Sequence, residues 1–534
     1  MIPLSRDLSP VSSARSQLDT ITTSILWNRI TSVLDEAAAT LVRSAFSPVV
    51  REANDFACVL TDSQGRSLGQ SSLSLPSFLR TTPMTIREFI RRFLPEALRP
   101  GDVLITNNPW IASGHLPDVT MAMPIFNGHR LVAFAGCCAH MSDMGGRNRS
   151  ADAMDLFEEG LQVPPMHFLR QGTPNVTLQD VIRANVRVPD QVLGDLYAQV
   201  SAMSLLGDRI LALMTEYGLP EIDSAADVIL DIAEQAMRQS LQTTPDGVYE
   251  AELIADGTDE PITIRVKLTI RGDTIQADYA GTSQQVRAGL NCVMNYTYAY
   301  TAFPIKCALD PETPNNDGSF RPITVTAPSS SVLNPDYGAP VGSRVILGHL
   351  LHEAVFAALA GVVPDKVIAG CGAPGWGFSL HGRRDNGETF SVQFSFGGGE
   401  GAAAQGPGVP CTRFPSNIAN TPVEIMEIAA PIRIWRKELR PDSGGSGQQP
   451  GGAGQVVVIE FLTDQPLALS LRGDHTKVPP RGLAGGGSGA CATVSLNGRP
   501  IDSKRQHTVR KGDRLVLETA GGGGYGSRGS PRHA

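Results

Sequence analysis

The sequence lacks several features that identify large protein classes. Its eight cysteines include no Cys-x-x-Cys pair, which argues against a zinc finger or a disulfide framework. The longest apolar run, residues 131–139, is far too short to span a bilayer. The first residues also lack the charged and apolar regions of a secretory signal. We therefore expect a cytoplasmic protein that does not enter a membrane.

Two further absences concern ligands. The chain has no Gly-x-x-x-x-Gly-Lys-Ser/Thr motif, so it carries no standard P-loop for nucleotide phosphates. Its formal net charge is −8, and no run of basic residues departs from that balance. Proteins that bind nucleic acid through bulk electrostatics carry a basic surface. We therefore expect no nucleic-acid partner.

Glycine and proline are abundant instead, at 55 and 38 of the 534 residues. Much of the glycine falls in four clusters of the C-terminal third, at 397–401, 444–454, 485–489 and 521–526. These clusters alternate with strand-like segments. The alternation predicts tight turns in a β-rich region and argues against one disordered linker.

Hydrophobic periodicity divides the rest of the chain into helices and strands. Apolar residues at helical spacing predict helices over 24–46, 189–217, 224–241, 293–308 and 345–360. Thr82-Pro83 has the form of a helix N-cap followed by proline at the first helical position. Alternating patterns predict a strand hairpin around 62–65, a strand over 102–106 and an antiparallel meander over 247–277.

The expected fold class is α+β, with a mixed N-terminal half and a β-rich C-terminal third with glycine turns. A chain of 534 residues is too long for one simple core. The predicted division is an N-terminal tail at 1–21, a mixed α/β region at 22–245, a meander plus helices at 246–365, a β-rich region at 366–527 and a tail at 528–534.

Two His-x-x-Asp pairs give the strongest chemical signal: His115 with Asp118, and His140 with Asp143, 25 residues further on. Asn127-Gly128, midway between the pairs, favours a two-residue type I′ turn. If the turn centres on this dipeptide, cross-strand partners have numbers that add to 255, and His115 pairs with His140. Two imidazoles and two carboxylates would then meet at one end of a hairpin. That set can bind a divalent metal ion.

A structural interpretation stays open beside this one. A single His-x-x-Asp pair usually holds a hydrogen-bonded loop histidine or an N-cap aspartate. Pro117 and Pro124 are poorly tolerated inside a paired strand, and they fit an edge strand or a bulge. Cys137 and Cys138 could supply a thiolate, but adjacent cysteines in an apolar run are typical of packed core.

Other candidates are single residues. Asp55 lies in a polar cluster between a predicted helix and a predicted strand, where it could be functional or a turn residue. Glu159 follows the hairpin and could serve as a base, although paired glutamates are usually solvated. Lys306, on an apolar helical stretch, could have a lowered pKa or could extend its amine to solvent.

In combination, the ordered motifs from about residue 22 to residue 527 resemble the hydantoinase B/5-oxoprolinase B family. They include Arg51-Glu-x-x-Asp-Phe56, Pro100-Gly-Asp-Val103, Thr106-Asn-x-Pro-Trp110, Gly114-His-Leu-Pro-Asp-Val119, Ala139-His-x-x-Asp-x-Gly-Gly146, Glu159-Gly-Leu-x-x-Pro-Pro165, Asn185-Val-Arg-x-Pro189, Pro314-x-Asn-x-Gly318, Arg321-Pro322, Arg440-Pro-Asp-Ser-Gly-Gly445 and the terminal Gly-Gly-Gly-Gly-Tyr-Gly526.

The resemblance implies a subunit of an ATP-dependent cyclic-amide hydrolase, or of a related carboxylase, that works with a hydantoinase A-type partner. In such systems the partner binds ATP and phosphorylates the substrate, and the B-type subunit carries the metal site. The absent P-loop agrees with that division. On the matching positions, His115, Asp118, His140 and Asp143 become metal candidates, and Asp55 joins them as ligand or base.

Three departures from the family pattern affect the expected substrate. Met141 stands where members often have a second histidine. The stretch Gly145-Gly-Arg-Asn-Arg-Ser150 replaces a Gly-Gly-x-x-Pro-Gly-Ser pattern, and Pro76-Ser-Phe-Leu79 replaces Pro-x-His-Leu. These changes put the substrate class in doubt, whereas both His-x-x-Asp pairs survive.

The leading hypothesis is therefore a metal-dependent subunit that hydrolyses a phosphorylated hydantoin, lactam or 5-oxoproline-like ring, with Asp55 or Glu159 as proton acceptor. The alternatives are a subunit of an ATP-dependent ketone carboxylase and a non-catalytic scaffold subunit. The implied cofactors are zinc, manganese or iron, and ATP used by the partner. We expect a hetero-oligomer.

Overall fold

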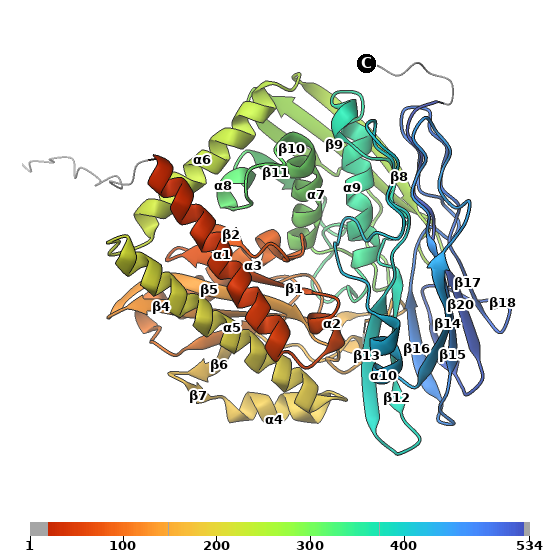
Figure 1. The fold of residues 1–534 in the computed structure, drawn as a ribbon, viewed down its shortest axis with the longest axis horizontal. Coiled ribbons are helices and arrows are strands. Elements are labelled where there is room, and N and C mark those ends of the chain that lie inside the picture. The colour runs from red at the N-terminus through yellow and green to blue at the C-terminus, as the bar shows by residue number, and fades with distance from the viewer. Residues whose placement is uncertain (1–19, 148, 373, 528–534) are drawn as a thin grey trace, which may run out of the picture.

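The computed structural model describes residues 20–147, 149–372 and 374–527, and it has the expected α+β composition (Figure 1). The predicted tails at 1–21 and 528–534 lie outside the described residues, apart from residues 20 and 21. Among the described helices, none combines the length and the apolar character that a membrane span needs.

The first layer is a seven-stranded sheet of order β2-β1-β5-β4-β3-β6-β7. Helices α1 (Thr20–Ser44) and α5 (Pro189–Glu216) cover one face, and α3 (Phe78–Phe93) covers the other (Figure 1). The strands are β1 (Phe56–Asp62), β2 (Ser67–Gln70), β3 (Val103–Thr106), β4 (Asp118–Asn127), β5 (Arg130–His140), β6 (Met166–Arg170) and β7 (Thr173–Pro174).

Burial on both faces explains why the central strands are almost wholly apolar. In β1, Phe56, Cys58 and Leu60 join the core under α1 and α5. Ala57 and Val59 pack on the opposite face. Cys137 and Cys138 follow the same alternation on β5, so both are core residues as expected.

The second sheet has the order β11-β10-β9-β8 and contains the predicted meander. Its strands are β8 (Gly247–Ala255), β9 (Ile262–Arg271), β10 (Thr274–Asp278) and β11 (Ile323–Thr326), the last of which runs parallel to β10. Helix α9 packs on β8, β9 and α7. The helices of this part are α6 (Asp223–Gln242), α7 (Met294–Leu309), α8 (Asp317–Phe320) and α9 (Val345–Leu359).

Two sheets form the C-terminal third, with orders β13-β12-β16-β19 and β14-β15-β20-β17-β18. One apolar core, which includes Trp376, Phe378 and Ile459, lies between them. The strands are β12 (Gly377–Arg383), β13 (Thr389–Ser395), β14 (Ile432–Leu439), β15 (Gln455–Phe461), β16 (Leu467–Arg472), β17 (Thr493–Leu496), β18 (Arg499–Pro500), β19 (Gln506–Val509) and β20 (Arg514–Glu518). The remaining helices are α2 (Pro48–Arg51), α4 (Val176–Asn185), α10 (Val423–Ala429) and the 3₁₀ turns Pro95–Ala97, Leu156–Glu158 and Pro364–Lys366.

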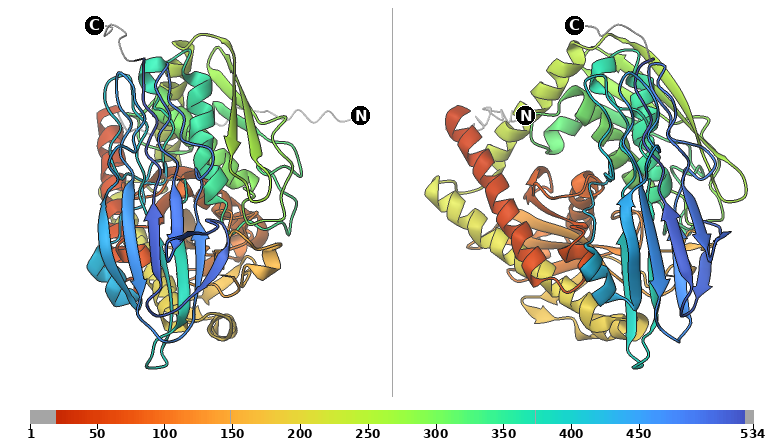
Figure 2. Two further views of the ribbon diagram at one scale, coloured as in Figure 1. Left: turned by 90° about the vertical axis from the view of Figure 1, so that its right-hand side faces the viewer. Right: turned by 45° about the vertical axis from the view of Figure 1, so that its right-hand side comes forward.

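The glycine clusters are mostly not tight turns, so that expectation was wrong. Among the glycines of the four clusters, only Gly485 and Gly526 have a positive φ. The clusters run as extended segments beside one another, beyond the ends of the two C-terminal sheets (Figure 2). The amide of Gly522 donates to the carbonyl of Gly452 at 2.9 Å. A Cβ on Gly522 would lie 1.9 Å from the carbonyl oxygen of Glu400, so close backbone approach requires the glycine.

The metal-candidate hairpin forms, but with another register. Its two-residue loop is Gly128-His129, because Asn127 pairs with Arg130. Glycine at the first loop position, with φ of +63°, fits a type II′ turn. A bulge between Ile125 and Phe126 shifts the pairing once more, so His140 lies opposite Asp118. The predicted pairing of His115 with His140 was therefore wrong.

Helix α3 also begins earlier than predicted. It starts at Phe78, and Pro83 lies in its interior, so Thr82 is not the N-cap. Burial of Phe78 and Leu79 favours the additional turn. Pro124 lies on β4 beyond the residues that pair with β3, so β5 is its only neighbouring strand. Its missing N–H is tolerated there, as expected for proline at an edge position.

Candidate metal centre

Three of the predicted ligands meet at the ends of β4 and β5. Asp118 opens β4 directly opposite His140, the last residue of β5. Asp118 Oδ1 lies 2.7 Å from His140 Nδ1 and 2.8 Å from His115 Nε2. The three ligand atoms lie within 4.8 Å of one another, and all three side chains are buried. This group could bind a metal ion.

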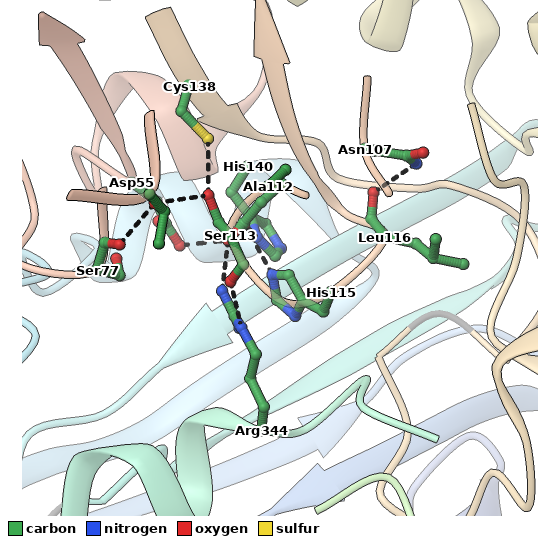
Figure 3. Close-up of polar contacts among 12 residues, drawn as sticks. Asp55, Ser77, Asn107, Ala112, Ser113, His115, Leu116, Cys138, His140 and Arg344 are labelled. Atoms are coloured by element: carbon green, nitrogen blue, oxygen red, sulfur yellow. Dashed lines mark hydrogen bonds and ion pairs between the residues drawn. The ribbon is translucent and has the colours of Figure 1, made fainter. Parts of the chain in front are cut away.

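The loop before β4 brings His115 to this point. The side-chain amide of Asn107 donates to the carbonyl of Leu116 at 2.8 Å (Figure 3). Gly114 has a φ of +92°, and a Cβ there would lie 2.7 Å from the guanidinium of Arg344. The imidazole rings of His115 and His140 therefore lie side by side, with centroids 5.1 Å apart (Figure 3).

Carbonyl oxygens fix the outer nitrogen of each imidazole. His115 Nδ1 lies 3.1 Å from the Gly342 oxygen, and His140 Nε2 lies 2.8 Å from Gln393 Oε1. The Gln393 amide is oriented by its Nε2, which donates to the Ser142 oxygen at 3.2 Å. Because the Gly342 oxygen only accepts, Nδ1 of His115 donates its proton, and Nε2 of His115 presents a lone pair to Asp118. Besides its contact with the Gln393 oxygen, His140 Nε2 lies 3.4 Å from Arg149 Nη1.

In this arrangement Nε2 of His115 and Oδ1 of Asp118 are both hydrogen-bond acceptors, and they face each other. Burial, together with the nearby Arg344 guanidinium, holds the pKa of His115 well below its usual value, so the ring is neutral. A neutral imidazole lone pair 2.8 Å from a carboxylate oxygen is unfavourable unless a cation lies between the two atoms. Outer N–H groups bound to carbonyls are the usual support of metal-ligating histidines. The donor set therefore fits a divalent metal ion.

Asp55 lies beside the group. Its backbone oxygen accepts from the His140 amide at 3.0 Å, and its Oδ2 lies 4.0 Å from His140 Nδ1. Burial raises the pKa of the Asp55 carboxyl. A carboxylate close to the metal candidates can accept a proton from a water molecule.

Asp143 does not join the group. Its Oδ1 accepts from Arg187 Nη1 at 2.7 Å and from the Gly145 amide at 3.1 Å, and its Oδ2 accepts from the Arg187 amide. Both oxygens are thus used in holding the segment after β5. The prediction that Asp143 is a ligand receives no support from this geometry.

Glu159 acts on the group through a loop. Its Oε1 accepts from the amides of Val341 and Gly342 at 2.7 and 2.6 Å, and the Gly342 carbonyl is the partner of His115. Burial raises the pKa of Glu159 to about 8. The side chain does not line the cavity beside the histidines. The geometry therefore makes Glu159 a positioning residue.

Several residues of the site, among them Arg344 and Gln393, were not predicted from the sequence. Arg344 donates to the Ser113 carbonyl at 2.6 Å (Figure 3). It also donates to Asp118 Oδ2 at 2.6 Å, and its guanidinium lies over the Tyr296 ring. Gln393 comes from β13 in the C-terminal third. A signal for Gln393 does exist, because it is a polar residue between Val392 and Phe394 on a buried strand.

The cavity beside the histidines is narrow. Its volume of about 10 Å³ leaves room for a single water-sized species. Segments far apart in the sequence line the cavity. The site therefore lies between the N-terminal sheet, the helices α3, α7 and α9, and the loop around 416–418. The lining includes Asp55, Ser77, Phe78, Arg149, Tyr300, His349, Ser416 and Ile418.

Lys306 and the glycine segment 397–401 lie outside the site. Lys306 is buried on α7 and pairs with Asp310 at 3.0 Å, so its amine does not extend to solvent. Burial lowers the pKa of the amine, yet it lines none of the site described above. The glycines at 397–401 approach other backbone segments within the C-terminal third.

Comparison with known proteins gives four findings. Residues 19–528 match the sequence model of the family described as hydantoinase B/oxoprolinase. A relative from a Pseudomonas species, named as the B-type component of a putative D-/L-hydantoinase, is 30% identical over 553 residues, which cover 97% of this chain and 92% of the relative. The crystal structure of the ATP-dependent caprolactamase from Pseudomonas jessenii superimposes with a TM-score of 0.86 at 25% identity, covering 96% of this chain and 92% of that one. A structure of acetone carboxylase shares the fold, with a TM-score of 0.85 at 17% identity, covering 94% of this chain and 76% of that one.

Proposed function

The chain belongs to the hydantoinase B/oxoprolinase family, and from this premise we propose that it is the hydrolytic subunit of an ATP-dependent enzyme that opens a cyclic amide. The substrate class is a hydantoin, a lactam or a 5-oxoproline-like ring. Relatives named as a hydantoinase component and as a caprolactamase support this class. The observation that carries the proposal is the convergence of His115, Asp118 and His140 on one buried point.

The chemistry requires activation of the ring. An amide resists hydrolysis because resonance stabilises its carbonyl group. Transfer of a phosphoryl group to the carbonyl oxygen opens the carbon to attack by water. The ring C–N bond then breaks with the nitrogen as leaving group, and the resulting acyl phosphate is hydrolysed to a carboxylate and inorganic phosphate. Because this chain has no P-loop motif, we assign the phosphoryl transfer from ATP to a hydantoinase A-type partner. The Pseudomonas relative is itself named as one component of a larger enzyme, which supports such a hetero-oligomer.

His115, Asp118 and His140 would hold one divalent ion, and nitrogen and oxygen ligands suit zinc, manganese or iron. When bound, such an ion supplies Lewis-acid activation of water or of the reacting carbonyl group. Residues of the protein hold these three ligands in place. The Gly342 carbonyl holds His115 in one tautomer, Gln393 positions the ring of His140, and Arg344 orients the carboxylate of Asp118 through its Oδ2.

Asp55 is the proposed proton acceptor. It lies within 4.0 Å of His140 Nδ1, outside the three-residue group, and it lines the same cavity as the two histidines. Its raised pKa brings it closer to the range in which a carboxylate exchanges protons efficiently at neutral pH. Glu159 contributes by binding the amide of Gly342, whose carbonyl contacts His115, so it is a positioning residue in this assignment.

Reconstitution tests the function. The chain and an A-type subunit encoded beside it are combined and supplied with ATP and a panel of hydantoins, lactams and 5-oxoproline. We expect ATP hydrolysis to rise with one ring class and ring-opened product to accumulate. ATP turnover that depends on bicarbonate would instead identify a ketone carboxylase. A purified chain that binds no metal and adds nothing to turnover would identify a scaffold subunit.

A further inference from the structure

Three arginines close to the histidines are buried with too few partners. Arg149, Arg413 and Arg472 are each at most 5% exposed. Within the described part of the chain, Nε of each has no hydrogen-bond partner, and neither has Nη2 of Arg472. Burial of a charged group with unpaired N–H bonds is costly. Such groups suit an anionic ligand, whose oxygens can accept from the unpaired N–H bonds.

Arg149 places this cluster at the candidate metal centre. It lines the same cavity as His115 and His140. Its Nη1 lies 3.4 Å from His140 Nε2 and donates to Gln393 Oε1 at 3.1 Å. The guanidinium therefore lies on the outer side of His140, next to the C-terminal sheet.

Arg472 reaches the same place from β16. It pairs with Gly377 on β12, and Ser379, two residues along that strand, pairs with Gln393 on β13. Arg472, Ser379 and Gln393 therefore share one face of the sheet, the face on which Gln393 contacts His140. A Cβ on Gly377 would lie 2.9 Å from Arg472 Nη2, so the glycine leaves the space that the guanidinium crosses.

Arg413 closes the group from the loop after β13. Its Nη1 donates to the Trp376 carbonyl at 3.1 Å. Its carbonyl accepts from the hydroxyl of Ser416, which lines the cavity together with Ile418. Arg413 is therefore held on the cavity side of the C-terminal sandwich.

The charges of the cluster do not balance. Burial and the neighbouring Arg149 charge lower the pKa of Arg413 to about 10, and burial with the charges of Arg149 and Arg413 holds the pKa of Arg472 well below its usual value. The opposing carboxylate felt by all three is Asp55. Asp118 is already bound to Arg344 through Oδ2. A metal ion at the histidines would add further positive charge.

We propose that Arg149, Arg413 and Arg472 form an oxyanion subsite that binds the phosphoryl group of the activated substrate. The proposal rests on the function proposed above, since the phosphoryl group comes from the partner subunit. Guanidinium groups in a buried site suit a dianionic tetrahedral group because they form charge-assisted and bidentate hydrogen bonds. Its position next to His140 puts the phosphoryl group of the substrate beside the carbon that water attacks. Since the cavity holds about one water molecule, entry requires the lining side chains to move apart.

Phosphate binding to the chain alone tests the subsite. The purified chain is treated with a chelator, so that no metal contributes, and is titrated with inorganic phosphate by calorimetry and by thermal unfolding. We expect the wild-type chain to bind phosphate and its Tm to rise. Arg472→Met and Arg413→Met should bind at least about tenfold more weakly, whereas Arg499→Met, at an exposed position on β18, should bind as the wild type does. Unchanged phosphate affinity in both site variants, or no binding by the wild type, overturns the subsite.

Stability without phosphate separates binding from a structural role. Replacing a buried, under-paired guanidinium by methionine should leave the Tm of Arg472→Met equal to the wild-type Tm or raise it. A lower Tm with unchanged phosphate affinity would show that the arginine is structural. A parallel titration with bicarbonate identifies the source of the oxyanion. Tighter binding of bicarbonate than of phosphate would overturn the phosphoryl assignment.

Because no partner, ATP, ring substrate or metal is present, this experiment is independent of the proposed function. Phosphate binding through the arginines, combined with failure of the reconstituted complex to open any ring, would leave the subsite and remove the function. A complex that opens rings while the arginine variants still bind phosphate would keep the proposed function and overturn the subsite.

Discussion

The orientation of two imidazole rings decides what the buried site can bind. His115 and His140 each use the outer nitrogen on a carbonyl oxygen, from Gly342 and Gln393, and turn the inner nitrogen to Asp118. Neither carbonyl partner belongs to the predicted hairpin. The sequence could predict the histidines and the aspartate but not the groups that position the two rings, since those groups come from residues more than 200 positions away.

Replacement of Asp55 by asparagine separates a base from a ligand. Because Asp55 lies outside the three-residue group, we expect Asp55→Asn to keep its metal content and to lose about 100-fold or more in turnover of the reconstituted complex. Elemental analysis and steady-state kinetics measure the two quantities. Loss of metal would make Asp55 a ligand, and normal metal with normal turnover would leave it only a local structural role.

Asp143 gives the matched comparison. Its ion pair with Arg187, at 2.7 Å, holds the segment after β5. We expect Asp143→Asn to lower the free energy of unfolding by about 1–3 kcal/mol, the cost of weakening a buried hydrogen-bonded charge, and to leave metal affinity unchanged. Chemical denaturation and metal titration of the same sample check this. A variant of normal stability that has lost its metal would restore Asp143 to the ligand set.

At the scale of elements, hydrophobic periodicity predicted the helices correctly, whereas the strand register and the close backbone contacts were not predicted. The helices at 189–217, 224–241, 293–308 and 345–360 were confirmed as α5, α6, α7 and α9, because long amphipathic or apolar runs leave few alternatives. The hairpin register was wrong by a few residues, since it depends on which dipeptide forms the loop and on a bulge that no local pattern marks. The glycine segments were misread, because sequence does not distinguish a glycine needed for positive φ from one needed for close approach.

Gly522→Ala tests the close approach. The added Cβ would lie 1.9 Å from the Glu400 carbonyl oxygen, and backbone cannot yield as a flexible side chain does. We expect a loss of about 2 kcal/mol or more in the free energy of unfolding. Gly361→Ala is the control, because a Cβ there has nothing within 4 Å. Equal stability of the two variants, measured by denaturant unfolding, would contradict this packing.

At the scale of the whole molecule, the site joins regions that the sequence treats separately. β4 and β5 supply Asp118 and His140, α9 begins just after Arg344, and β13 supplies Gln393. The predicted boundaries at 245 and 365 stay predictions. The structure adds that the site includes side chains from both the N-terminal and the C-terminal regions, because Gln393 on the C-terminal sheet contacts His140.

The division of labour with a partner predicts an inactive isolated chain. Since the sequence holds no P-loop motif, we expect the chain by itself neither to bind ATP tightly nor to hydrolyse hydantoins. ATP hydrolysis is measured in a preparation from which any A-type subunit has been removed. Substantial ATPase activity there would contradict the proposed assignment of ATP to the partner.

Metal binding by the two histidines tests the account most directly. We expect one divalent ion per wild-type chain, and at least about tenfold weaker binding in His115→Ala and in His140→Ala, because each loses one ligand. His129→Ala, at the exposed hairpin loop, should bind as the wild type does. Elemental analysis and metal titration of the four proteins give the result. Full metal occupancy in both site variants would contradict the metal centre and return the two histidines to a structural role.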